Sequence, residues 1–246
     1  MIKQKLLIIG GCTASGKSKF ALELTKYLNM EIISADSIQV YKHLDKGTSK
    51  PSLEEKAVCK HHLVDIVEPS DTFNAYNFVE LAKDAIEKIQ SQNKLPVIVG
   101  GTGLYIESLL YDYNFNKQTK NEQVSNYDYK LFVMHCERSR LYEIINKRVD
   151  KMVESGLIDE VKQLKIEGYE NCQCMQAIGY KEIFEYLNGN CDLDSAINLI
   201  KQRTRNYAKR QITWFKHMKN AEWVDTETDL DKTKENILEY FKEYKK

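Results

Sequence analysis

Short apolar runs alternate with helical patterns of apolar residues along the first half of the chain. The runs are bounded by turn residues, and their length predicts buried strands rather than helices. Ser52 with Glu55 forms a capping box for one short helix, and Asn74 is placed to cap a longer one. This alternation predicts an α/β fold with a mostly parallel sheet and helices on both faces. The predicted strands are residues 6–9, 31–34, 62–67, 96–99 and 131–134, with helices at 52–60 and 74–89.

The second half of the chain has a different pattern, because helical periodicity dominates it. Four helices are expected, and a polar interval without apolar period separates them from the first half. We therefore expect four parts: residues 1–113 as an α/β core, 114–128 as a loop, 129–225 as the last core strands with a helical substrate-binding part, and 226–246 as a terminal helix. The four helices are predicted at residues 139–154, 157–165, 175–187 and 196–219.

A phosphate-binding loop follows the first predicted strand. The stretch Gly-Cys-Thr-Ala-Ser-Gly-Lys-Ser matches G-x-x-x-x-G-K-[ST] and precedes a helical pattern. Backbone N–H groups at the start of that helix point at an oxyanion, the lysine supplies a charge, and the last serine hydroxyl is a candidate ligand for Mg²⁺. The core is thus expected to be P-loop NTPase-like and to bind a diphosphate or polyphosphate. The residues concerned are Gly11, Cys12, Thr13, Ala14, Ser15, Gly16, Lys17 and Ser18.

Two other loops end predicted strands and should meet the phosphate loop at the same edge of the sheet. One contains Asp36, Ser37, Ile38 and Gln39, and the other is the glycine-rich stretch around Thr102. Asp36 has three candidate roles: a partner of Mg²⁺ or water, an acceptor of a proton from a nucleophile, or a cap for a turn. Thr102 is expected to contact substrate, with a role in the turn as the alternative.

One segment is strongly basic, although the formal net charge of the 246 residues is zero. No acidic residue occurs between Asp194 and Glu222, and the basic side chains there predict a local anion site. On the expected helix, Arg203, Tyr207, Arg210 and Trp214 share one face, with Arg205 and Lys209 in an adjacent stripe. We expect phosphate contacts from Arg205, Lys209 and Arg210; the alternative is a solvated charged helix with Trp214 and Phe215 packed on the core.

The cysteine spacing and the apolar stretches indicate the cellular compartment. The six cysteines show no C-x-x-C spacing, so neither a disulfide framework nor a zinc site is expected. The residues before the first strand are too short for a signal peptide, and no stretch is apolar enough to span a bilayer. A reduced, cytoplasmic protein is the expectation, without a membrane partner.

Several motifs together resemble the bacterial tRNA dimethylallyltransferases. Beyond the phosphate loop, they occur in the family's order from about residue 6 to residue 224, which makes the resemblance specific. The matching stretches are residues 36–41, 47–51, 100–105, 148–150 with Met152, 156–157, 175–182 and 204–215.

The resemblance implies transfer of a dimethylallyl group from its diphosphate, with Mg²⁺, to N6 of the adenosine next to the anticodon of a tRNA. Asp36, Lys17, Thr102 and Arg205 would be catalytic, and the loop with Arg205, Lys209 and Arg210 would hold the diphosphate. The tRNA anticodon arm and its extruded base would meet Asp36, Ser37, Ile38, Gln39, Thr102, Gln176, Ala177, Ile178, Gly179, Tyr180 and Lys181. A monomer is expected.

The chain departs from the family pattern in one interval. A helical insertion with an Asn-Asp…Arg motif, which helps to grip the anticodon stem, is reduced here to residues 111–130. Adenylate isopentenyltransferases, which prenylate free AMP, also lack it and are the main alternative. A P-loop kinase of small molecules and a binding protein without catalysis are two further readings; the intact Lys17, Ser18 and Asp36 argue against the last.

Overall fold

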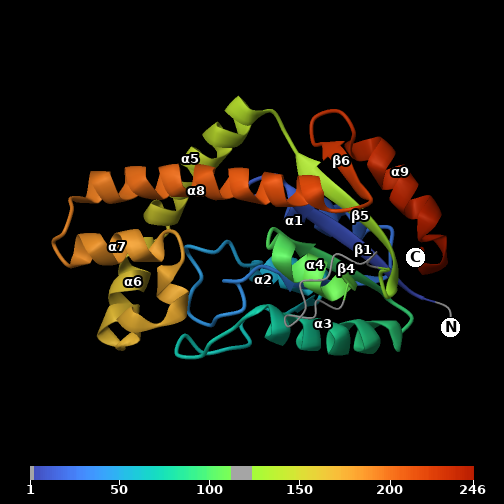
Figure 1. Ribbon diagram of the computed structural model, residues 1–246, viewed down its shortest axis with the longest axis horizontal. Coiled ribbons are helices and arrows are strands. Elements are labelled where there is room, and N and C mark those ends of the chain that lie inside the picture. The colour runs from blue at the N-terminus through green and yellow to red at the C-terminus, as the bar shows by residue number, and fades with distance from the viewer. Residues whose placement is uncertain (1–2, 112–123) are drawn as a thin grey trace.

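A six-stranded sheet forms the centre of the computed structural model, which describes residues 3–111 and 124–246. All its strands are parallel, in the order β3-β2-β4-β1-β5-β6. The expected P-loop-like α/β fold is therefore confirmed (Figure 1). The strands are β1 Gln4–Gly11, β2 Met30–Ala35, β3 His61–His62, β4 Leu95–Gly100, β5 Tyr127–His135 and β6 Ala221–Asp225.

Helices cover both faces of the sheet because each strand buries alternate residues on opposite sides. In β1, Leu6 and Ile8 pack toward α3 and α4, whereas Leu7 and Ile9 pack toward α1 and α9. Helices α5, α6 and α7 lie beyond the carboxyl ends of the strands, and α8 runs from them back to the sheet, where Phe215 packs on Gly10 of β1 (Figure 1). The α-helices are α1 Lys17–Leu24, α2 Leu53–Val58, α3 Ala75–Gln90, α4 Gly103–Tyr111, α5 Arg138–Glu154, α6 Leu157–Ile166, α7 Tyr180–Leu187, α8 Leu193–His217 and α9 Leu230–Tyr240.

Local sequence signals set several boundaries as expected. Ser52 and Glu55 form the capping box of α2, and the Asn74 side chain accepts hydrogen bonds from two N–H groups at the start of α3. The basic helix is α8, which begins at Leu193, three residues before the expected start. No helix in the described ranges is both long and apolar enough to cross a membrane.

Three predicted elements differ from the structure. The strand expected at residues 62–67 ends at His62, because Leu63 and Asp65 take left-handed backbone conformations with φ of 61° and 58°. The helix expected at 175–187 begins only at Tyr180, after a 3₁₀ turn at Gln173–Gln176 and a break at Gly179 with φ of 99°.

The third difference concerns the last part of the chain. Strand β6 was not predicted, and the terminal segment is the helix α9 followed by a 3₁₀ turn at Lys242–Tyr244. Of the loop expected at 114–128, residues 114–123 lie outside the described residues, and β5 already begins at Tyr127.

Candidate active site

The phosphate loop joins β1 to α1 at the carboxyl edge of the sheet. Gly11 has φ of 141°, and a Cβ there would lie 2.5 Å from the Met134 carbonyl oxygen of β5. Only glycine therefore fits at this position, where the chain turns from β1 into the phosphate loop. Gly16 caps α1 in a left-handed conformation, φ 85°, which leaves the first N–H groups of α1 free of intrahelical partners. The sequence correctly predicted that this loop lies between a strand and the start of a helix.

Lys17 points into a large cavity beside the loop, with a volume of about 590 Å³. Its Nζ donates a hydrogen bond to the Cys12 carbonyl oxygen at 2.8 Å. Burial lowers the pKa of Lys17 to about 8; the positive charge of Arg148 acts in the same direction, and the Asp36 carboxylate opposes it. Burial thus destabilises the charged form of Lys17, and an anionic ligand would stabilise it.

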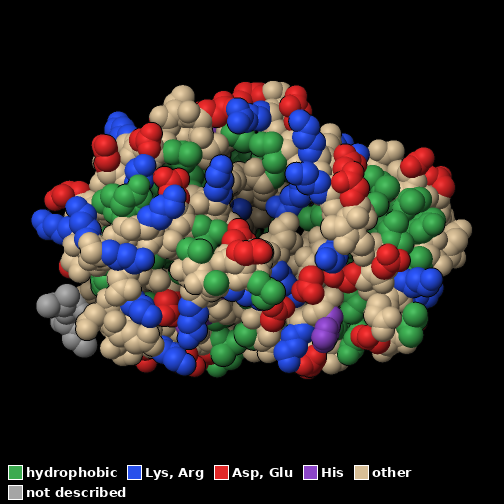
Figure 2. Space-filling view, turned by 180° about the vertical axis from the view of Figure 1, so that it is seen from behind, with side chains coloured by type: hydrophobic (Ala, Val, Ile, Leu, Met, Phe, Trp, Pro, Cys, Tyr) green, Lys and Arg blue, Asp and Glu red, His purple; other side chains and the backbone are tan. Residues whose placement is uncertain are grey.

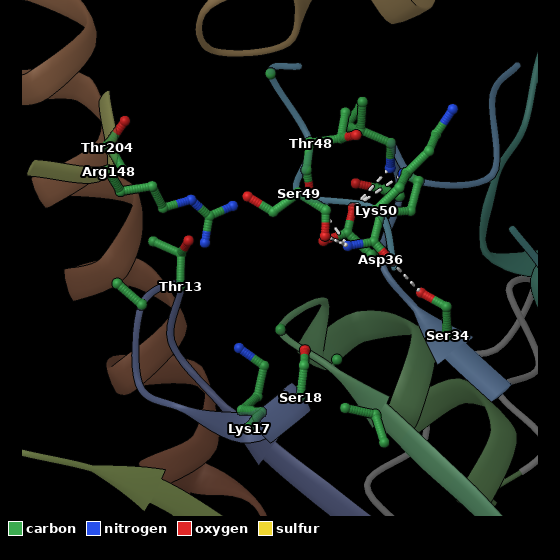
Figure 3. Close-up of a pocket in the computed structure, with 18 of the residues that line it drawn as sticks. Thr13, Lys17, Ser18, Ser34, Asp36, Thr48, Ser49, Lys50, Arg148 and Thr204 are labelled. Atoms are coloured by element: carbon green, nitrogen blue, oxygen red, sulfur yellow. Dashed lines mark hydrogen bonds between the residues drawn. The ribbon is translucent and has the colours of Figure 1, made fainter. Parts of the chain in front are cut away.

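Arg148 enters the same cavity from α5 and faces the phosphate loop (Figure 3). Burial lowers its pKa, which the Asp36 charge partly offsets. Among residues 3–111 and 124–246 no ion pair or hydrogen bond engages its guanidinium. An arginine without a partner in such surroundings is costly unless a ligand supplies the negative charge.

Asp36 directly follows β2 and lies across the cavity from the loop (Figure 3). Its Oδ1 accepts hydrogen bonds from the backbone N–H groups of Ile38 at 2.9 Å and Gln39 at 3.3 Å. The carboxylate therefore caps a turn, which is one of its candidate roles, and it also lines the cavity. The turn fixes its orientation, and no described residue hydrogen-bonds to Oδ2.

A polar rim lies on the Asp36 side of the cavity. Gln39 Nε2 donates to the carbonyl oxygens of Thr48 and Ser49, each at 3.1 Å, and Gln39 Oε1 accepts from Ser34 Oγ at 3.0 Å. These bonds hold the loop at residues 47–50 over the cavity. On the helical side, the lining residues are Gln176, Ala177 and Ile178, as expected, with Val149, Met152 and Ile200.

Gln211 of α8 ties two of the loops together. Its Oε1 accepts from the Thr13 N–H at 2.8 Å, and its Nε2 donates to the Gly101 carbonyl at 3.0 Å. Burial raises the pKa of the neighbouring Tyr207 to about 12, the Asp36 charge adds to this, and contact with Thr102 partly offsets it. Thr102 directly precedes α4 and does not line the cavity, although Gly100 and Gly101 do.

The basic residues of α8 divide between two surfaces. Arg210 lines the cavity, a position that allows the phosphate contact expected from the sequence, and its Cζ lies 5.6 Å from the centroid of the Tyr207 ring. Arg205 and Lys209 do not: Arg205 donates to Asn146 Oδ1 at 2.7 Å, and both lie beside Tyr142 of α5. The expectation that these two contact the diphosphate conflicts with this placement.

The segment at residues 179–181 also differs from its expected RNA-facing role. Tyr180 is fully buried, and its hydroxyl donates to Glu160 Oε1 at 2.7 Å and accepts from the Gly47 N–H at 3.2 Å. Lys181 reaches back to Gln176 Oε1, and Gly179 donates to Glu182 Oε2. These residues do not line the cavity; they support the two segments that do.

A magnesium ion fits the site only together with a ligand. No group of three or more His, Cys, Asp or Glu side chains suited to a metal occurs in the described part of the chain. Ser18 and Asp36 line the same cavity as the phosphate loop. Mg²⁺ commonly takes one or two protein ligands and completes its shell with phosphate oxygens and water, which this arrangement allows.

Three residues of the site received no role from the sequence: Arg148, Gln211 and Glu160, which accepts a hydrogen bond from the buried Tyr180 hydroxyl. A signal existed for Arg148, because it falls at the helical spacing of the apolar stripe formed by Leu141, Ile145 and Val149. A charged residue on a buried stripe is a candidate functional group.

A parallel sheet with a Lys-Ser phosphate loop, unpaired cations and a facing carboxylate defines a P-loop protein for a phosphorylated ligand. Comparison with known proteins agrees. The model of the IPP transferase family matches residues 39–126 and 114–218. A tRNA dimethylallyltransferase from an Exiguobacterium species is 39% identical over 284 aligned positions, covering 92% of this chain and 91% of the relative. The chain belongs to the IPP transferase family.

Solved structures give the same result. A tRNA isopentenylpyrophosphate transferase from Bacillus halodurans superposes with a TM-score of 0.89 at 37% identity, covering 98% of this chain and 96% of that one. The Staphylococcus epidermidis protein of that name gives 0.89 at 34%, covering 98% and 99%.

The sequence matches also show that this chain is shorter than the Exiguobacterium relative within the aligned region. The alignment of 284 positions is longer than the 246 residues here, so the Exiguobacterium relative has residues without counterparts. The two segments matched to the family model meet at residues 114–126, within the interval where the insertion was expected to be reduced.

Proposed function

We propose that this chain transfers a dimethylallyl group from dimethylallyl diphosphate to N6 of the adenosine next to the anticodon of tRNA. One observation carries the proposal: Lys17 of the phosphate loop lines one cavity together with Arg148, Arg210 and the Asp36 carboxylate. The names of the relatives, which are tRNA dimethylallyltransferases and tRNA isopentenylpyrophosphate transferases, supply the prenyl donor and the acceptor class.

The phosphate loop and its cations act on the leaving group. N6 attacks C1 of the prenyl group, the C1–O bond breaks, and its electron pair leaves with diphosphate. Negative charge grows on the leaving oxygen, where Lys17, Arg148 and Arg210 stabilise it, with the Thr13 and Ser18 side chains also on the cavity wall. Such preorganised charge is worth about 10²–10³-fold per donor.

Asp36 acts on the nucleophile. The Ile38 and Gln39 N–H groups hold Oδ1, which leaves Oδ2 to accept a hydrogen bond from the N6 amine. As the N–C bond forms, the nitrogen becomes cationic, and the carboxylate accepts its proton. The rim held by Gln39 and the Gln176–Ile178 segment enclose the adenine from two sides.

Magnesium would be held by the Ser18 hydroxyl and the diphosphate oxygens, and when bound it supplies further positive charge to the leaving group. Ser18 Oγ lies at the start of α1 on the cavity wall, where it can orient such an ion without a complete protein cage.

The test is an incorporation assay with labelled dimethylallyl diphosphate and with tRNA and AMP as competing acceptors. The proposal expects label on a tRNA with adenosine beside the anticodon. Label on AMP alone would identify an adenylate isopentenyltransferase, and ADP formed from ATP with phosphorylation of a metabolite would identify a kinase.

Two Asp36 variants separate its chemical role from its structural one. Asp36→Asn keeps an oxygen for the turn but removes the charge, whereas Asp36→Ala removes both. We expect both to lower kcat at least about 100-fold with diphosphate binding intact in Asp36→Asn. Near-normal turnover in Asp36→Asn would show that Asp36 only stabilises the turn and takes no part in the reaction.

A further inference from the structure

Three cations surround one aromatic ring on the side of α8 that faces away from the cavity. Arg138 Nε donates to the Tyr142 hydroxyl at 3.0 Å, and its Cζ lies 5.2 Å from the ring centroid. The Arg205 Cζ lies 5.9 Å from the same centroid, and Lys209 lies beside the hydroxyl. We call Arg138, Arg205 and Lys209 the outer basic cluster.

No carboxylate pairs with this cluster in the described part of the chain. Other basic residues of α8 do have acidic partners: Lys201 pairs with Asp150 at 2.6 Å, and Arg203 with Glu182 at 2.5 Å. The Glu137 carboxylate next to Arg138 is occupied by the Ser139 hydroxyl and the N–H groups at the start of α5. Charges of the same sign are therefore held together without compensation, which favours an external anion.

The cluster continues into a polar groove between α5 and α8. Apart from Leu199, the groove is lined by the polar residues Asn146, Ser195, Asn198, Lys201 and Gln202, together with Arg205 of the cluster. Neutral amide and hydroxyl groups beside cations are the side chains that contact phosphate and sugar along a nucleic-acid backbone. A single small anion would not need a groove of this extent.

The outer basic cluster adjoins the active site through the phosphate loop. Tyr142 and Ala14 pack in one apolar cluster, and Ala14 lines the cavity. Arg210, one residue after Lys209 on α8, lines the cavity as well. The face in Figure 2 is hollowed near its middle, and Lys and Arg side chains gather beside the hollow.

We propose that the outer basic cluster and the adjoining groove bind backbone phosphates of the RNA whose adenosine occupies the cavity. The inference rests on the proposed function, since it assumes an RNA acceptor. It assigns Arg205 and Lys209 to the polyanion rather than to the prenyl diphosphate, in agreement with their position outside the cavity.

The experiment compares Arg138→Gln/Lys209→Gln with Lys26→Gln/Lys88→Gln. The second pair removes the same charge from exposed lysines for which no ion pair occurs in residues 3–111 and 124–246. Binding of an anticodon stem-loop RNA is measured against salt concentration, and KM is measured for the stem-loop and for dimethylallyl diphosphate. Both variants retain Arg205 and its bond to Asn146, so the helix packing is preserved.

For the cluster variant, we expect stem-loop affinity to fall roughly tenfold per lost contact at 0.1 M salt, and the salt slope to decrease by about 0.7–0.9 per contact. The KM of dimethylallyl diphosphate and the kcat should not change, and the control variant should behave like wild type.

Each other outcome has a separate meaning. Unchanged stem-loop binding with normal RNA prenylation overturns the inference and leaves the proposed function standing. A raised KM for dimethylallyl diphosphate alone assigns the cluster to that substrate and also overturns the inference. Wild-type enzyme that prenylates no RNA overturns the proposed function, and the inference with it.

Discussion

Lys17 should lose its charge, and with it the affinity of the enzyme for dimethylallyl diphosphate, as the pH rises above about 8. Burial lowers the pKa of this lysine to about 8 in the free protein. Affinity should fall rather than rise with pH, because the diphosphate binds the ammonium form of Lys17. This form predominates below pH 8 and is depleted above it.

The size of the effect follows from the titration. If only the charged form binds, kcat/KM is halved at the pKa and falls about tenfold per pH unit above it, so that pH 9 retains roughly a tenth of the plateau value. Bound diphosphate raises the pKa of Lys17, so kcat should stay level to a higher pH than kcat/KM does. The diphosphate substrate is already ionised in this range, because its last pKa is about 6.

Initial rates between pH 6.5 and 9.5 test this, with Lys17→Arg as the matched variant. Arginine stays charged throughout, so its lower activity should show no fall above pH 8. Nearby groups do not interfere, because burial raises the pKa of Cys12 to about 11 and that of Tyr207 to about 12. A level kcat/KM up to pH 9.5 in wild type, or the same fall in Lys17→Arg, would refute the assignment.

Three further substitutions test the support of the site. Gln211→Leu leaves one N–H and one carbonyl of the two loops unpaired. Unfolding in urea should therefore show that the free energy of unfolding falls by about 3 kcal/mol, and the KM for dimethylallyl diphosphate should rise. Both effects should be smaller in Gln211→Glu, which keeps the hydrogen-bond acceptor for the Thr13 N–H. Tyr180→Phe should cost about 1–3 kcal/mol in the same assay and raise the KM of the RNA acceptor; an unchanged KM would show that this buried hydroxyl does not hold the rim. Arg148→Met should lower kcat about 100-fold and shift the alkaline fall in kcat/KM to higher pH, since the positive charge of Arg148 lowers the pKa of Lys17; a fall that stays at pH 8 would contradict that coupling.

The sequence predicted those parts of the fold that local signals determine. The phosphate loop, the caps of α2 and α3 and the central apolar strands each depend on residues close together in the chain, and they lie where expected. Strand β6 was missed because its short sequence, Ala221–Asp225, is stabilised by pairing with β5, which is distant in sequence.

The site was predictable down to its loops but not to the direction of every side chain. Periodicity placed Arg205, Lys209 and Arg210 on neighbouring stripes of one helix, yet a single sequence does not reveal which stripe faces the sheet. Tyr180 illustrates the same limit: its buried ring packs so closely on Gly47 that a Cβ there would lie only 2.4 Å away, and this tertiary contact has no local sequence signal.

The packing of α8 places its basic residues on two separate surfaces, as binding of the two proposed anionic ligands requires. Phe215 is fully buried against β1, where a Cβ at Gly10 would lie 2.6 Å from its ring, and this contact fixes the rotation of the helix about its axis. At about 100° per residue, Arg205 is then turned about 140° away from Arg210, so one guanidinium faces outward when the other enters the cavity. Because the two arginines face different surfaces of the same helix, a substitution in the outer basic cluster should change RNA binding without changing the KM of dimethylallyl diphosphate.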